Sequence, residues 1–166
     1  MESISLKKVN LESQNIDELK ALGKKLGELI EPSTLIILSG ELGAGKTTFT
    51  GAIAEGMEVE CSITSPTFQF LKRYSSGRIP LDHMDVYRIE AAPQLVDIGF
   101  WDLLSKVEPG ALIVEWGEKF NSVVSASDLV VRICVADADT RDIEIMSHSE
   151  KGNELLEALC KDFACS

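Results

Sequence analysis

The stretch that decides the fold is Gly40-Glu41-Leu42-Gly43-Ala44-Gly45-Lys46-Thr47. It fits the pattern GxxxxGK[ST] without a mismatch. Glycines at these spacings let the backbone fold tightly round an anion and point successive N–H groups at it. The lysine supplies a point charge for β- and γ-phosphates, and the threonine hydroxyl is placed to ligate Mg²⁺. The sequence therefore predicts a phosphate-binding loop.

Both flanks of this loop have the pattern that such a loop requires. Thr34 to Ser39 is an apolar run too short for a helix and typical of a strand buried on both faces. A helix is predicted from Lys46 to near Gly56, and its N-terminus adds the positive end of the helix dipole. A glycine-rich turn that binds nothing would match the bare pattern too, but the strand before it and the helix after it favour nucleotide binding.

The elements further out predict an α/β domain with a sheet of mixed direction. Apolar residues at helical spacing predict a helix from Ile16 to Ile30, with Asn15 and Glu18 forming a capping box at its start. Strands are expected at 68–74, 79–86, 111–114 and in a late hairpin around 129–145; further helices are expected at 92–104 and 155–163. No linker or repeat divides the chain. Residues 1–166 are therefore predicted to form one P-loop NTPase-like three-layer domain, a mixed central sheet flanked by helices.

Composition narrows the class of function. The 166 residues include 16 Lys+Arg against 27 Asp+Glu, which gives a net charge of −11. That acidity argues against a protein that grips nucleic acid or an anionic membrane by its own surface. The four cysteines show no CxxC spacing, and neither a signal peptide nor a bilayer-length apolar run is evident. We therefore expect reduced thiols, a cytoplasmic location and no membrane association.

Two acidic residues at predicted strand ends can complete a phosphoryl-transfer site, which needs a metal-side carboxylate and a group that positions water. Glu115 ends the apolar run 111–114, where a Walker B acid emerges at the carboxyl edge of a sheet. Asp85 lies in the segment HMDVYR, residues 83–88. A carboxylate within reach of the γ-phosphate can orient or deprotonate water. The alternative for Glu115 is an acid that ends a strand and has no role in the chemistry.

Other polar residues near these acids have less specific signals. Strand alternation puts His83, Asp85 and Tyr87 on one face, although a lone histidine beside acids is more typical of a structural or surface residue. Ser65-Pro66-Thr67 is a hydroxyl-rich loop that can close over a nucleotide as a switch. A plain proline turn explains that loop equally well.

Four motifs together resemble the bacterial TsaE (YjeE) family, the small ATPase of tRNA threonylcarbamoyladenosine biosynthesis. They are the loop at 40–47 with Thr48-Phe49 after it, Ser65-Pro66-Thr67-Phe68, the HxDxYR segment at 83–88, and Val114-Glu115-Trp116. The first motif is shared by all P-loop proteins, whereas HxDxYR and EW at these spacings are much more specific. The resemblance covers nearly the whole chain.

The resemblance implies ATP and Mg²⁺ as cofactors, Thr47 and Glu115 as metal ligands, and Asp85 and Lys46 as catalytic residues. The nucleotide contacts that it implies are Gly40, Glu41, Leu42, Gly43, Ala44, Gly45, Lys46, Thr47, Thr48, Thr67 and Trp116. It also implies two partners, TsaB and TsaD, which modify adenosine 37 of ANN-decoding tRNAs and which ATP hydrolysis resets between turnovers. At this net charge we expect little direct tRNA contact. Activity alone should be low, because no arginine finger is evident in cis.

The chain departs from the family pattern at Glu41, where an aspartate is usual, and at Leu19, where a threonine is common. Three other functions are alternatives to the ATPase. A GTPase would need DxxG and NKxD motifs, and the sequence has neither. A small-molecule kinase would need an arginine-bearing lid, whereas the arginines here are scattered. The third alternative is a non-hydrolysing interaction module whose shape is fixed by bound nucleotide. It would have the same pocket as the ATPase, so the sequence does not decide between them.

Overall fold

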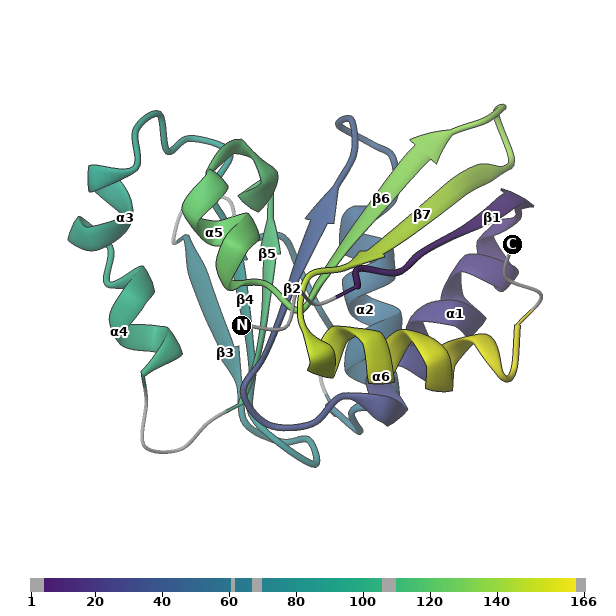
Figure 1. Cartoon of the computed structure of the whole chain (residues 1–166), viewed down its shortest axis with the longest axis horizontal. Coiled ribbons are helices and arrows are strands. Elements are labelled where there is room, and N and C mark those ends of the chain that lie inside the picture. The colour runs from purple at the N-terminus through teal and green to yellow at the C-terminus, as the bar shows by residue number, and fades with distance from the viewer. Residues whose placement is uncertain (1–4, 61, 67–69, 106–109, 164–166) are drawn as a thin grey trace.

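The computed structural model describes residues 5–60, 62–66, 70–105 and 110–163. Its centre is a seven-stranded sheet in the order β1-β7-β6-β2-β5-β4-β3 (Figure 1). The strands are β1 (Lys8–Gln14), β2 (Thr34–Ser39), β3 (Leu71–Tyr74), β4 (Leu81–Asp85), β5 (Ala111–Glu115), β6 (Leu129–Val135) and β7 (Arg141–Ser147). The helices are α1 (Ile16–Leu29), α2 (Lys46–Gly56), α3 (Pro93–Asp97), α4 (Phe100–Leu104), α5 (Asn121–Ala126) and α6 (Glu150–Cys160), with a 3₁₀ turn η1 (Gly117–Lys119).

The sheet is mixed, as predicted. β2 lies between β5 and β6 and is parallel to both, and β4 is parallel to β5. β3 pairs antiparallel with β4, and β6, β7 and β1 pair antiparallel in turn. In the parallel part, Leu38 and Asp85 both pair with Glu115. The carboxyl ends of β2, β4 and β5 therefore meet at one edge, where open α/β sheets bind ligands.

Helices cover both faces of the sheet, which confirms the predicted three-layer fold (Figure 1). Successive residues of β2 point to opposite faces because side chains alternate along a strand. Ile36 and Leu38 pack in the core with α1, α2 and α6. Leu35 and Ile37 pack in a second core with residues of α3, α4 and α5. Every residue of β2 is buried, as expected for a central strand.

Helix α1 begins with the predicted capping box. Asn15 and Glu18 exchange side-chain to backbone hydrogen bonds of 2.9 and 2.7 Å.

Helix α1 packs against α2 through direct backbone contact. Small residues form the crossing: a Cβ added to Gly27 would lie 2.0 Å from the carbonyl oxygen of Ile53, and one added to Gly56 would lie 2.0 Å from that of Lys24. Since α2 begins at the lysine of the loop, this close crossing fixes the loop against α1.

The remaining element predictions have mixed outcomes. Strand 34–39 and helix 46–56 form as predicted, and strand 79–86 is shorter, beginning at Leu81. Strand 68–74 begins at Leu71 in the described residues, because 67–69 lie outside them. The single helix predicted at 92–104 is wrong: Gly99 adopts a left-handed conformation (φ 76°) and separates α3 from α4. β1 and α5 were not predicted. None of the helices in the described part of the chain is long and apolar enough to cross a membrane.

Candidate nucleotide site

The glycine-rich loop joins β2 to α2 in a conformation that its glycines permit. Gly45, immediately before α2, has φ 116°, and Gly40, immediately after β2, has φ 149°. Such positive φ values strain residues that carry a Cβ. A Cβ at Gly40 would also lie 2.4 Å from the carbonyl oxygen of Ile133 in β6. The start of the loop therefore lies directly against β6, with no room for a side chain at Gly40.

Lys46 folds back across this loop. Its Nζ donates to the carbonyl oxygens of Gly40 (2.5 Å) and Glu41 (2.9 Å) and lies 4.2 Å from the centre of the Trp116 ring. The side chain is only 5% exposed. Burial lowers the pKa of the amine, an effect that the nearby carboxylates of Glu115, Glu118 and Asp85 oppose. The amine is thus held at the loop, where a phosphate oxygen can replace a carbonyl as its acceptor.

Asp85 and Glu115 lie side by side at the ends of β4 and β5. They are paired residues in the parallel register and project to the same face as α2. Asp85 is partly buried and its Oδ1 accepts the N–H of Tyr87 at 2.8 Å. Burial raises the pKa of the Asp85 carboxyl, the Tyr87 N–H opposes this, and Glu115 adds to the rise. A raised carboxyl pKa suits a group that accepts a proton.

His83 lies beneath these acids and is fully buried. Its Nε2 and Oε2 of Glu115 are 2.8 Å apart. We expected a structural or surface residue at His83; its complete burial rules out the surface alternative, and its partner is the predicted metal ligand. β4 ends at Asp85, so the alternation predicted to include Tyr87 stops before it. The Tyr87 ring instead contacts Trp116 at 4.9 Å between centroids.

A cavity of about 270 Å³ brings the predicted residues together. Its lining consists of Leu42, Gly43, Gly45, Lys46, Thr47, Thr48, Ser65, Asp85, Glu115 and Trp116. Four predicted functional side chains, those of Lys46, Thr47, Asp85 and Glu115, therefore surround one space. Of the predicted switch loop, Ser65 reaches this lining, whereas Thr67 lies outside the described residues.

A second cavity, of about 490 Å³, adjoins the first and was not foreseen from the sequence. Gly43, Gly45 and Thr48 line both cavities, while Leu19 and Arg141 line only the second. Its wall is thus built by the start of α1, the loop and the β6–β7 turn. Leu19, one of the two departures from the family pattern, is 3% exposed and forms an apolar part of this wall.

Two basic residues that the sequence did not single out hold the site from outside its motifs. Arg141 Nε donates to the carbonyl of Ala44 at 2.8 Å, which ties the loop to β7. Lys119 Nζ donates to the carbonyls of Tyr87 (2.8 Å) and Ile89 (2.7 Å). The two bonds from Lys119 hold the turn that follows Asp85. Neither has a local sequence signal, because each depends on a contact distant along the chain.

The oxygen ligands in the first cavity suit Mg²⁺ if phosphate oxygens of a nucleotide complete its coordination. Among the described residues, no group of three or more His, Cys, Asp and Glu side chains could hold a metal. Mg²⁺ prefers oxygen ligands and is commonly held by one or two carboxylates together with nucleotide phosphates. The Thr47 hydroxyl and the Glu115 carboxylate are donors of that kind.

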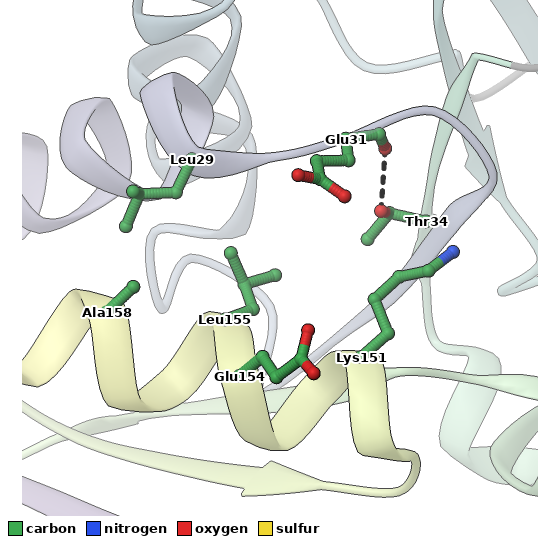
Figure 2. Close-up of a pocket in the computed structure, with 7 residues that line it drawn as sticks. All are labelled: Leu29, Glu31, Thr34, Lys151, Glu154, Leu155 and Ala158. Carbon is green, nitrogen blue, oxygen red and sulfur yellow. Dashed lines mark hydrogen bonds between the residues drawn. The ribbon is translucent and has the colours of Figure 1, made fainter.

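A third hollow lies at the opposite edge of the sheet and is a poor candidate. Figure 2 shows Leu29, Leu155 and Ala158 on its apolar side, with Glu31 and Lys151 near the start of β2. Thr34 there donates to the carbonyl of Glu31 at 2.7 Å. This hollow of about 170 Å³ lies at the amino ends of the parallel strands, away from the edge where α/β sheets bind ligands.

A buried parallel strand, a glycine loop spanned by its own lysine, and a helix that begins at that lysine define the P-loop class of α/β proteins. A model of one family, described as "Threonylcarbamoyl adenosine biosynthesis protein TsaE", matches residues 13–143. The chain belongs to the TsaE family.

Curated relatives and a solved structure agree with this assignment. The "tRNA threonylcarbamoyladenosine biosynthesis protein TsaE" of Bacillus subtilis is 33% identical over 156 residues, which cover 94% of this chain and 96% of the relative. The protein of the same name from Haemophilus influenzae is 30% identical over 149 residues, covering 86% and 92%. The crystal structure of Bacillus subtilis YdiB superposes with a TM-score of 0.71 at 31% identity, covering 96% of this chain and 99% of that one.

Proposed function

We propose that this protein is an ATPase that binds ATP with Mg²⁺ and serves the threonylcarbamoyladenosine modification of adenosine 37 in ANN-decoding tRNAs. Membership of the TsaE family supports the pathway. The observation that carries the chemistry is the cavity in which Lys46, Thr47, Asp85 and Glu115 meet beside the loop. A charge for phosphate, hard oxygen donors and a carboxylate for water are the parts that phosphoryl transfer needs.

In this proposal the phosphates occupy the first cavity and the adenosine occupies the adjoining one. Backbone N–H groups of the loop and the N-terminus of α2 bind the phosphates. The Lys46 amine exchanges the carbonyls of Gly40 and Glu41 for phosphate oxygens. The shared lining residues Gly43, Gly45 and Thr48 support this placement, because a nucleotide must pass between the two spaces.

The positions of the two acids support a route for hydrolysis. Thr47 and Glu115 would hold Mg²⁺, which supplies neutralisation of charge on the phosphates. Asp85 accepts a proton from water as the water oxygen bonds to the γ-phosphorus and the bond from that phosphorus to the β–γ bridging oxygen breaks. Lys46 stabilises the charge that develops on the phosphate oxygens. ADP and inorganic phosphate are the products.

The proposed partners are TsaB-like and TsaD-like proteins, as the family resemblance implies. Among the described residues that line the first cavity, Lys46 is the only cation. A site with so little positive charge should turn over slowly until a partner completes it. The net charge of −11 supports little direct contact with tRNA, and we place the protein in the cytoplasm.

Three variants test the proposal. Lys46→Ala should weaken ATP binding, because a charge facing the triphosphate is lost. Asp85→Asn should keep most ATP affinity but lower turnover by about 10²-fold or more, the scale for loss of a positioned acid–base group. Glu115→Ala should weaken Mg²⁺-dependent binding as well as turnover. Each is measured for ATP binding by calorimetry and for hydrolysis with the partner proteins present.

The same variants separate the ATPase from the non-hydrolysing module. If Asp85→Asn hydrolyses ATP at the parental rate, Asp85 has no part in the mechanism. If a hydrolysis-dead variant supports tRNA modification over many turnovers, nucleotide only fixes the shape of the protein and the ATPase proposal is wrong. Parental ATP affinity in Lys46→Ala would remove the loop as the phosphate site.

A further inference from the structure

His83 occupies an unusual place for a polar side chain. It lies in the middle of β4 between the buried Leu81 and Asp85. Its paired neighbours in the sheet are the buried Ile113 of β5 and Lys72 of β3. The imidazole is 0% exposed. An apolar side chain would fill this position without the cost of removing a polar ring from water. A role in packing alone therefore does not account for a histidine here.

The single hydrogen-bond partner of the ring shows which of its two nitrogens donates. Oε2 of Glu115 lies 2.8 Å from Nε2, and a carboxylate oxygen can only accept. Nε2 therefore carries the hydrogen and donates. Nδ1 is buried and has no hydrogen-bond partner among the described residues. The bond to Glu115 is therefore the only hydrogen bond that the ring makes to the described residues.

We propose that His83 is the positioning residue of Glu115. By bonding to Oε2, the ring restricts rotation of the carboxylate, so that Oε1 would be the oxygen available to the Mg²⁺ that accompanies the nucleotide. Glu115 lines the first cavity, whereas His83 is absent from its described lining, so His83 acts through the carboxylate. Groups that orient a metal ligand typically account for about 10–100-fold in metal affinity. This inference rests on the proposed function.

The test compares two amides that differ in reach. The side-chain nitrogen of Gln extends about as far as Nε2 and can still donate to Glu115, whereas that of Asn lies near the position of Nδ1 and cannot. Mn²⁺ serves as the probe: the affinity of each variant for Mn²⁺, with a non-hydrolysable ATP analogue bound, is measured from the electron paramagnetic resonance of the free ion. We expect His83→Asn to lose about 10–100-fold in Mn²⁺ affinity, and His83→Gln to recover most of that loss.

Two controls isolate the hydrogen bond from general damage. Ile113→Val removes one methyl group at the same depth, beside His83, and should lower stability without changing Mn²⁺ affinity. In a Glu115→Ala background, His83→Asn should no longer affect Mn²⁺ affinity, because a positioning residue has no effect once its ligand is gone. Affinity for the analogue without metal should be similar in parent and His83 variants.

The outcomes are distinguishable. If the parent binds no Mn²⁺–analogue complex, the proposed function is wrong. If the parent binds it and His83→Asn binds Mn²⁺ equally well, or His83→Gln is as weak as His83→Asn, the positioning role is wrong. An undiminished effect of His83→Asn in the Glu115→Ala background would also overturn it. If His83→Asn does not fold, the test uses His83→Gln, alone and in the Glu115→Ala background. Because Gln can still donate to Glu115, a loss of Mn²⁺ affinity in His83→Gln contradicts the proposal.

Discussion

The same substitution, glycine to alanine, should have opposite effects at two positions that are close in the fold. Gly27 of α1 faces α2, and a Cβ there would lie 2.0 Å from the carbonyl oxygen of Ile53 and 3.0 Å from Cα of Gly56. Gly51 of α2 has nothing within 4 Å of an added Cβ. Both lie within helices, where alanine is favoured over glycine. Only the space available to the methyl group differs.

The magnitudes follow from these distances. Non-bonded carbon atoms pack best at about 3.5–4.0 Å, so Gly27→Ala must move backbone against backbone by more than about 1 Å. Overpacking of this kind costs about 1–3 kcal/mol, and the upper end applies because the obstacle is main chain. Helix propensity returns about 1 kcal/mol. The net loss for Gly27→Ala is therefore about 2 kcal/mol, whereas Gly51→Ala should gain about 0.5–1 kcal/mol.

Urea unfolding followed by circular dichroism measures both changes, with an unchanged slope as the check that the midpoint shift reports stability. ATP affinity provides a second measurement: because α2 begins at Lys46, displacement of α2 should weaken ATP binding in Gly27→Ala but not in Gly51→Ala. The reasoning is refuted if Gly27→Ala is as stable as the parent, because backbone contact at 2.0 Å leaves no room for a methyl group.

Three further predictions concern the loop and its surroundings. ATP with Mg²⁺ should change the fluorescence of Trp116 as Lys46 leaves its ring; the signal should survive Trp101→Phe and vanish in Trp116→Phe. Arg141→Gln, which loses a charged donor to the loop, should raise the KM for ATP about tenfold with little change in kcat, measured in steady-state hydrolysis. Hydrogen bonds from Asp139 and Thr140 hold the pKa of Asp137 below its ordinary 3.8. Since a lowered carboxyl pKa stabilises the fold above the ordinary value, Asp137→Asn should be less stable at neutral pH, and its difference from the parent should close as pH falls through the lowered pKa.

The parts of the fold that the sequence predicts correctly are those whose patterns are local. Strand 34–39 is apolar throughout because it is buried on both faces, and the loop is recognisable because each glycine and the lysine have a fixed offset. Asp85 and Glu115 were placed together because the carboxyl ends of parallel strands share an edge. The register that pairs them bears out that reasoning.

The parts that failed depend on the backbone path or on distant contacts. Apolar spacing across 92–104 fits one helix, and periodicity alone does not detect the left-handed residue at Gly99 that ends α3. The isolated glycine was the only local signal of this break. β1 was missed because it is an edge strand with one face exposed, in which Leu11 is the residue in the core. The bond from His83 to Glu115 spans 32 positions, and that from Arg141 to Ala44 spans 97. No local pattern specifies contacts of that range.

The charge of the first cavity links the site to its proposed dependence on metal and partners. Asp85 and Glu115 line it, and Glu118 lies close enough to act on Lys46, so acids outnumber the cation. A nucleotide triphosphate adds further negative charge in a partly buried space, where repulsion is stronger than in water. In the proposed complex, Mg²⁺ held by Thr47 and Glu115 would offset part of that repulsion. ATP without Mg²⁺ should therefore bind weakly, and a partner that adds a positive group should accelerate hydrolysis more than it tightens binding, because charge on the phosphate oxygens is redistributed in the transition state.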